Sequence, residues 1–501
     1  MTADFKDDKV VAQHTEHYDP TAKDVNNTSS GSSIDLESLD IDEKRLIRKI
    51  DYHLVPWLAL LYLLSFLDRS NIGNANIFGL SEHLKLKKTP DEYGLCLAIF
   101  FVFYVLFEVP SNMVMKAWRP SMWIPTIMVA WGAVMIGMGF VTGFTSLFVT
   151  RLFLGITEAG LFPGVSFYLT QWYRKYEISW RISLFFSAAT AAGAFGGLLA
   201  RLINLMDGVG GYEGWRWIFI LEGILTVVVA VVSFWVMYDY PGTAKFLTEP
   251  ERAFVVNRLH LDNDGCSQAF KMKFVWDAFT DWKVWCAAIM FHGSLCPVYT
   301  FSLFAPTLTK NLGYTAARAQ LMSVPPYVAA AFVTLSAGWI SDRIQKRGIV
   351  VICCSTVGAL GYGLLLANVN NGVNYFALFL AASGMYPLIP VIVAWGANNC
   401  GGALKKGVAT AIIVSVGNCG GIVSSFIYPS RDAPGFKKGH AICLAYCIIC
   451  IITAVIMWVY CAAANKKRAA RNAARTHEWT AEEKLQFGDR GDHNDWFVYT
   501  L

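Results

Sequence analysis

Apolar stretches long enough to cross a lipid bilayer recur along this chain. Spanning about 30 Å of hydrocarbon takes roughly 20 helical residues. The 501 residues are 55% hydrophobic and 16% charged, which is too apolar for a soluble domain of that size. The sequence therefore predicts an all-α membrane protein with twelve transmembrane helices. We place them near residues 54–76, 92–115, 122–142, 146–170, 181–204, 216–238, 283–308, 317–340, 349–368, 373–396, 406–428 and 440–463.

The basic residues between these stretches predict which ends face the cytoplasm. Cytoplasmic loops carry an excess of Lys and Arg, and placing both termini inside puts roughly twice as many basic residues on the inner side. The exceptions lie in the first and last outer loops, at Lys85, Lys87, Lys88, Lys437 and Lys438. We therefore expect a multi-pass protein with both termini in the cytoplasm.

Several functional classes are disfavoured by the sequence. The net charge of +5 does not indicate a nucleic-acid partner, because the basic residues collect at helix ends as membrane orientation requires. Cys447 and Cys450 have C-x-x-C spacing, but no second pair completes a metal site. No phosphate-binding G-x-x-x-x-G-K-[ST] motif and no nucleophile and base motif is visible. We expect no enzyme, no metal and no cofactor.

Polar segments divide the chain into five parts. Residues 1–50 are too polar to fold alone and predict a disordered cytoplasmic N-tail, and residues 464–501 predict a cytoplasmic C-tail. Residues 51–239 and 282–463 each hold six of the apolar stretches, and residues 240–281 form a cytoplasmic linker between them. Two six-helix halves joined in this way are the layout of a transporter with parallel repeats, whose site lies near the membrane midplane between the halves.

The linker carries a signal for a short helix of its own. Thr248 and Glu251 have the spacing of a capping box at a helix start. The mixed charges that follow predict a short amphipathic helix on the cytoplasmic face of the membrane.

Two of the apolar stretches hold the charged pairs that we take as the main candidates. Asp68 and Arg69 follow the apolar run 54–67 within the first stretch, and Arg151 and Glu158 lie in the fourth. A central Asp or Arg costs roughly 2.5 to 3.5 kcal/mol to insert, so such residues usually face a bundle interior or a water-filled path. Arg151 and Glu158 are seven residues apart and share one helix face, about 10 Å from each other. Asp68 and Arg151 fall at similar depths, with Glu158 near the midplane.

The chemistry of these four residues indicates two tasks. Two arginines at one depth form a receptor for an anion, because guanidinium stays charged and its fork matches a carboxylate. The acids Asp68 and Glu158 can bind and release protons as the cavity opens to each side. We therefore predict substrate binding by Arg69 and Arg151 and proton coupling by Asp68 and Glu158. The alternative is a set of internal ion pairs that only hold helices together.

Three other polar residues inside the apolar stretches are candidates for substrate binding. Tyr104 shares a helix face with Glu108 four residues later, and His292 shares one with Tyr299 seven residues later. Asn418 lies in the eleventh stretch. A single His in such a helix is also explained by hydrogen bonding within a packed core.

One inner loop resembles a known family. Residues 338–348, GWISDRIQKRG, are similar to the gating-loop motif of the major facilitator superfamily. The resemblance implies a gating role for Asp342, Arg343, Lys346 and Arg347. The corresponding loop of the first half, residues 110–120, lacks the Asp.

Four further segments resemble the anion:cation symporters, and within them the fungal allantoate permease group with its nicotinate, pantothenate and biotin carriers. They are residues 68–75 (DRSNIGNA), 151–164, 214–223 (GWRWIF followed by Glu222 and Gly223) and 432–440 (DAPGFKKGH). The resemblance covers residues 45–465. It implies the major facilitator fold and proton-driven uptake of a small organic anion at the plasma membrane.

The resemblance also implies roles for single residues. In bacterial sugar-acid members the acids of the first and fourth helices couple protons and the neighbouring arginines contact substrate, which matches Asp68, Glu158, Arg69 and Arg151. Asn398, Asn399 and Asn418 also match family positions, and the first two lie near an inner helix end, where gating is implied.

These observations predict a transporter that works by alternating access and draws its energy from a proton gradient. Its substrate is a carboxylate such as a nicotinate-like vitamin, allantoate or a sugar acid, and its partners are that anion, the proton and the lipid bilayer. We expect it to function as a monomer. The alternatives are an exporter of a metabolite or xenobiotic, a facilitative uniporter and a nutrient sensor that does not transport.

Overall fold

A computed structural model describes residues 41–87, 91–174, 177–261, 272–429, 432, 435–475, 479, 483 and 488–501. All of these residues lie in the unit Ile41–Leu501. The predicted N-tail up to residue 40 is outside the described residues, as are Lys88, residues 433–434 of the motif at 432–440, and most of residues 476–487.

The described residues form helices and connections, without a strand among them. The helices are α1 (Glu43–Ile77), α2 (Leu80–His83), α3 (Glu92–Ala117), α4 (Pro120–Met138), α5 (Phe144–Glu158), α6 (Leu161–Thr170), α7 (Ile178–Ile203), α8 (Gly214–Val236), α9 (Glu249–Leu261), α10 (Met272–Thr280), α11 (Trp282–Asn311), α12 (Ala316–Ile344), α13 (Arg347–Ala367), α14 (Asn371–Met385), α15 (Leu388–Asn398), α16 (Ala403–Ser424) and α17 (Lys437–Ala473).

Twelve helical spans in this part of the chain are long and apolar enough to cross a membrane. This confirms the predicted all-α fold with twelve transmembrane helices. Two of the spans are interrupted by a short turn: α5 and α6 make the fourth, and α14 and α15 make the tenth. Each interruption falls in the fourth span of its half. Broken helices in corresponding positions of two repeats are typical of a transporter's binding site.

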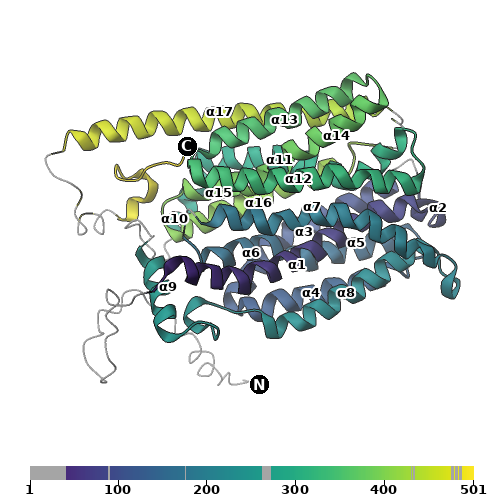
Figure 1. Ribbon diagram of the computed structural model, residues 1–501, viewed down its shortest axis with the longest axis horizontal. Coiled ribbons are helices and arrows are strands. Elements are labelled where there is room, and N and C mark those ends of the chain that lie inside the picture. Colours follow the sequence, from purple (N-terminus) through teal and green to yellow (C-terminus); the bar gives the residue numbers. More distant parts are fainter. Residues whose placement is uncertain are drawn as a thin grey trace, which may run out of the picture. The chain divides into compact units, whose positions relative to one another are not determined.

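The spans separate into a first half, α1 to α8, and a second half, α11 to α17, which lie side by side in Figure 1. Within the first half, α4 packs on α8 and α1 on α7, while α11 packs on α16 and α13 on α14 in the second. The halves meet where α7 contacts α12 and α15, α3 contacts α16 and α1 contacts α11. A residue on α1 or α3 can therefore bridge the two halves.

The first and last helices run beyond the predicted spans on the polar side of the membrane. α1 begins at Glu43 rather than near residue 54, and Asp42 caps it by accepting from the Lys44 and Arg45 N–H groups. Its first turns pair with α9, where Lys49 Nζ lies 2.7 Å from Glu251 and Arg258 Nε lies 2.6 Å from Glu43. α17 runs to Ala473 instead of residue 463. We call the membrane face with the α1 start, α9 and the last described residues the tail side, and the opposite face the far side.

The linker forms two helices where the sequence indicated one. Glu251 accepts from the Thr248 N–H at 2.8 Å at the start of α9. The second helix, α10, has no counterpart in the sequence prediction.

Candidate functional site

An ion pair joins α1 to α5 at the turn between α5 and α6. Arg69 Nη2 lies 2.7 Å from Glu158 Oε1, and both side chains are buried. Ser65, one turn before Arg69, donates to the same oxygen at 2.5 Å. The α5 helix ends at Glu158, so this carboxylate sits where the fourth span is interrupted. The pair places a cation and an acid together inside the first half.

The same arginine reaches the second half. Arg69 Nη1 donates to Tyr299 Oη at 3.0 Å, and Tyr299 donates to Asn418 Oδ1 at 2.8 Å. Asn418 Nδ2 then donates to Glu108 Oε2 at 3.2 Å, which returns the chain of hydrogen bonds to α3. Charged and polar groups of both halves thus form one buried network, and a change at Glu158 can reach α11 and α16 through Arg69.

Aromatic rings surround the Arg69 guanidinium. Its Cζ atom lies 4.9 Å from the Tyr104 ring centroid, 5.3 Å from that of Phe100 and 5.6 Å from that of Tyr299. Cation–π contacts of this kind strengthen when water is excluded. The candidate residue Tyr104 contacts this network through its ring, which lies against the Arg69 guanidinium.

Arg151 lies beside the network with unmet hydrogen-bonding capacity. Its side chain is fully buried, with Cζ 5.0 Å from the Phe100 centroid, and its Nε donates to the Cys96 carbonyl at a long 3.4 Å. Nη1 and Nη2 have no hydrogen-bond partner among the described residues. A buried guanidinium stays charged. This corner of the site therefore carries a positive charge with free donors.

Asp68 points away from this network. Its Oδ2 accepts from Trp131 Nε1 at 3.1 Å and from Thr226 Oγ1 at 2.8 Å, so it faces α4 and α8 inside the first half. Adjacent helical residues are about 100° apart, which separates Asp68 from Arg69. The structure brings Arg69, Arg151 and Glu158 to one place and leaves Asp68 in another.

His292 also lies apart from the network. Its Nδ1 is 3.0 Å from the Val416 carbonyl, and its Nε2 is 3.3 Å from Tyr446 Oη. These contacts tie α11 to α16 and α17 within the second half.

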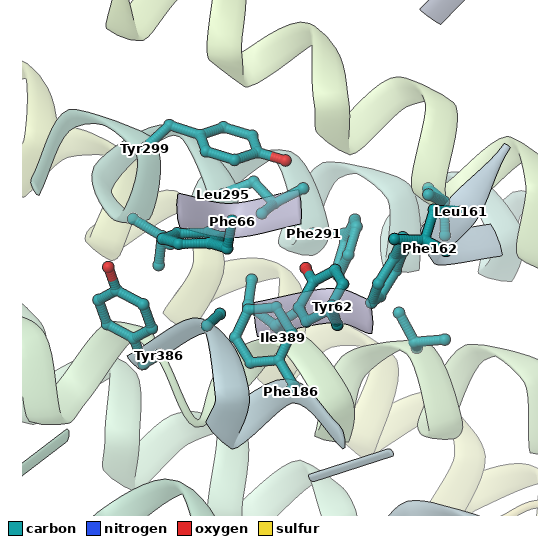
Figure 2. Packing of buried hydrophobic residues seen from close by; sticks show 14 of the residues in the cluster. Tyr62, Phe66, Leu161, Phe162, Phe186, Phe291, Leu295, Tyr299, Tyr386 and Ile389 are labelled. Atoms are coloured by element: carbon teal, nitrogen blue, oxygen red, sulfur yellow. The ribbon is translucent and has the colours of Figure 1, made fainter. Parts of the chain in front are cut away.

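An aromatic cluster lies on the tail side of Arg69, because Tyr62 precedes Arg69 by about two turns of α1. Figure 2 shows the rings of this cluster. The Tyr62 ring lies 5.6 Å from that of Phe162 and 5.7 Å from that of Phe186, and Phe186 lies 6.4 Å from Tyr386 of the second half. Ile389 is labelled beside these rings. The first three residues come from α1, α6 and α7, so the cluster spans both halves. A solute leaving toward the tail side would have to part these rings.

The predicted gating residues lie at the tail side. Asp342 accepts from the Trp180 N–H of α7 at 2.7 Å and from Arg347 Nη2 at 3.2 Å, which links α12 to the first half. Arg343 and Lys346 are exposed. Asn398 and Asn399 are buried at the end of α15, and Asn399 exchanges hydrogen bonds with the Thr500 backbone.

Several polar residues at these sites were not singled out from the sequence for binding or coupling. They are Ser65, Glu108, Trp131, Glu222, Thr226 and Tyr299. Glu108 and Glu222 carried the same signal that identified Asp68, a charge inside an apolar stretch. Hydrogen-bonding neutral residues such as Thr226 carry no such signal, because Ser and Thr are common in membrane helices.

The family model described as Major Facilitator Superfamily matches residues 58–425 of this sequence. The chain belongs to the Major Facilitator Superfamily.

Relatives within the superfamily cover most of the chain. The MFS-type transporter cnsO of Penicillium expansum is 36% identical over 474 residues, which cover 91% of this chain and 90% of that protein. The High-affinity nicotinic acid transporter of Saccharomyces cerevisiae is 31% identical over 429 residues, covering 85% and 80%. The superfamily member described here is therefore a membrane transporter of small solutes and not an enzyme.

A solved structure has the same fold. The bacterial homologue of the human lysosomal transporter Spinster, in an inward-facing and unoccupied conformation, aligns with a TM-score of 0.57 over 81% of this chain and 95% of that one. The sequence identity is 16%, so the likeness concerns the fold alone.

Proposed function

We propose that this transporter is a proton-coupled symporter that takes up a small organic anion by alternating access. The observation that carries the proposal is Arg151, a buried guanidinium with two donor nitrogens that no described protein group satisfies. A carboxylate at this place would accept both hydrogen bonds in fork geometry. The Phe100 ring lies beside the guanidinium groups of both Arg151 and Arg69, and it would form an aromatic wall for the same ligand.

The Arg69–Glu158 pair supports coupling to protons. While Glu158 is ionised, it holds the Arg69 guanidinium in an ion pair at 2.7 Å. A proton on Glu158 weakens that pair and leaves Arg69 free to attract an anion together with Arg151. Linkage then works in both directions, since an anion on Arg69 favours the protonated form of Glu158. Anion and proton would bind together, as symport requires.

Sequence similarity supports a carboxylate as the substrate. The relative in Saccharomyces cerevisiae is named for nicotinic acid, and the motifs resemble the allantoate permease group of the anion:cation symporters. We propose a nicotinate-like vitamin, allantoate or a sugar acid, carried by a monomer that needs no cofactor. We propose the plasma membrane as its location, as the resemblance to the allantoate permease group implies. We propose that the tail side faces the cytoplasm, because basic residues collect on that side.

Uptake of labelled nicotinate into liposomes tests this function. Purified full-length protein is reconstituted with an acidic exterior and an alkaline interior, and the Glu158→Gln variant is compared with the wild type. We expect the wild type to concentrate the probe only while the pH gradient lasts. We expect Glu158→Gln to keep substrate exchange but to lose the part of concentrative uptake that this proton drives, because a glutamine cannot release a proton. Competition by pantothenate, allantoate and gluconate at two external pH values would rank the carboxylates.

The control is Glu213→Gln, which changes a half-exposed glutamate paired with Arg216 at the far-side end of α8. It should transport like the wild type. Normal concentrative uptake by Glu158→Gln would contradict the coupling role. Flux that does not depend on the pH gradient would indicate a uniporter. Net outward pumping would indicate an exporter, and binding without flux would indicate a sensor.

A further inference from the structure

A second buried polar cluster lies inside the first half, between α1, α4 and α8. Asp68 is 1% exposed and Glu222 is 3% exposed. Glu222 Oε2 accepts a hydrogen bond from Asn71 Nδ2, while Asp68 Oδ2 accepts from Thr226 and Trp131. Neither carboxyl belongs to the chain of hydrogen bonds that contains Arg69.

The two acids face each other across an antiparallel helix pair. Asp68 and Asn71 are three residues apart on α1, and Glu222 and Thr226 are four apart on α8. Because Asp68 meets Thr226 while Asn71 meets Glu222, the two carboxyls lie about one helical turn apart along the interface, on the order of 5 Å.

Three oxygens of this cluster have no hydrogen-bond partner in the described part of the chain. They are Asp68 Oδ1, Asn71 Oδ1 and Glu222 Oε1. All three are acceptors when the acids are ionised, and a buried acceptor without a donor is costly. The cluster therefore holds more hydrogen-bond acceptors than donors. A proton on either carboxyl turns one of these acceptors into a donor.

No cation among the described residues faces these acids. Arg69, next to Asp68, is bound to Glu158 and Tyr299. The segment of α4 carries no titratable side chain, and α5 contributes only the acid Glu158 and Arg151, whose guanidinium is turned to Cys96 and Phe100.

The described residues of α7 and α8 offer no free cation either. On α8, Arg216 is paired with Glu213 and bonded to the carbonyls of Gly139 and Val141. On α7, Arg181 is paired with Asp51 and Arg201 is exposed. Two carboxyls this close, away from water and without a counterion, do not both ionise.

We propose that Asp68 and Glu222 form a proton-binding pair separate from the substrate network, with Glu222 as a proton-carrying residue of the transport cycle. The inference rests on the proposed proton-coupled function and adds a second proton site to it. Asp68 and Arg69 are neighbours on α1 and point about 100° apart. A proton that arrives at or leaves the pair changes how α1 packs on α8, and this repositions Arg69 without any direct contact between proton and substrate.

Infrared spectroscopy of the full-length protein tests the proton pair without any substrate. Protonated carboxyls absorb at a carbonyl stretching frequency that ionised ones lack. We expect wild-type protein at neutral pH to show this band, and the Asp68→Asn plus Glu222→Gln double variant to lose the intensity of one carboxyl. We expect the remaining single acid in Glu222→Gln to titrate at a different pH from the wild-type pair. Glu213→Gln, at the N-cap of the same helix, is the matched control and should match the wild type.

Two outcomes would overturn the proposal that Asp68 and Glu222 form a proton-binding pair. One is a double variant that folds and keeps the full wild-type band. The other is a band that disappears when sodium chloride replaces choline chloride at constant pH, which would make the cluster a sodium site. These readouts do not depend on transport.

A second measurement connects the pair to the cycle, using nicotinate as the probe. At a pH gradient of one unit and zero membrane potential, losing one coupled proton lowers the steady accumulation ratio about tenfold. We expect that loss in Glu222→Gln with exchange retained, and unchanged accumulation would remove Glu222 from the cycle. If the wild type carries no nicotinate, the proposed substrate fails while the infrared result still decides the proton pair.

Discussion

Arg69 and Arg151 are the same residue type in two different electrostatic surroundings. The charge of Arg69 is matched by Glu158, while among the described residues the Arg151 guanidinium donates one long hydrogen bond to the Cys96 carbonyl and lies beside the Phe100 ring. A buried charge without a counterion is unfavourable. Of the two, Arg151 has more to gain from an anionic ligand, so it should determine affinity, while Arg69 links the anion to Glu158.

Substituting Arg151 by lysine should weaken nicotinate transport at the level of binding. The lysine keeps the positive charge but replaces a planar fork with a point charge, so one of two parallel hydrogen bonds to a carboxylate is lost. We expect the half-saturation concentration in liposomes to rise roughly tenfold or more. Arg201→Lys, at an exposed position near the end of α7, is the matched control. Equal half-saturation for Arg151→Lys and the wild type would contradict an anion receptor at Arg151.

At the scale of elements, the last described segment, residues 488–501, packs against the tail-side ends of the second half. Asp492 lies 2.6 Å from Lys283 of α11 and 2.6 Å from Lys405 of α16. The Thr500 carbonyl accepts from Trp395 Nε1 at 2.8 Å. These contacts tie α11, α15 and α16 together at one end, so the segment moves with the second half.

The charge of Asp492 should stabilise this arrangement. Burial raises the pKa of this carboxyl, but Lys283 and Lys405 outweigh it and hold the pKa well below its usual range. The stabilisation is therefore complete above the pKa of the unfolded chain, about 4, and is lost as pH falls through the lower folded-state pKa. We expect Asp492→Asn to lower the free energy of unfolding by about 3 kcal/mol at neutral pH. Thermal unfolding followed by tryptophan fluorescence measures it.

The control for this change lies three residues later in the same segment. Asp495 pairs with Arg471 at 3.0 Å on the surface. Asp495→Asn should cost well under about 1 kcal/mol, because exposed pairs contribute little. The difference between wild type and Asp492→Asn should shrink below about pH 4. A difference that is equal at all pH values would mean that packing, not charge, holds the segment.

At the scale of the whole molecule, the sequence predicts the number of spans well because bilayer thickness sets the length of each apolar stretch. It also predicts which residues are costly in a membrane, such as Glu158. It does not predict which neighbour each charge meets. Glu108 and Asn418 are far apart in the sequence yet bonded at 3.2 Å, and Asp68 turns toward Thr226 instead of Arg151. Those pairings depend on how the helices are placed around one another, which helix periodicity alone does not contain.

The sequence also does not predict how closely the two halves approach on the far side, where single glycines lie at the contacts. A Cβ atom on Gly73 of α1 would lie 2.8 Å from the Leu303 carbonyl oxygen of α11, in the other half. On Gly421 of α16 it would lie 2.1 Å from the Phe101 ring of α3. Since the Leu303 obstacle is backbone, α1 and α11 can approach this closely only with glycine at position 73.

Gly73→Ala should therefore hold the halves apart on the far side. We expect concentrative nicotinate uptake to fall, and buried Cys96 beside Arg151 to react faster with a membrane-impermeant methanethiosulfonate added from the far side. Mass spectrometry of the labelled peptide measures the reaction. Gly137→Ala is the control, because a Cβ at Gly137 would meet no atom within 4 Å. If Cys96 labelling and uptake in Gly73→Ala both equal those of the wild type, contact between α1 and α11 at Gly73 does not limit closure.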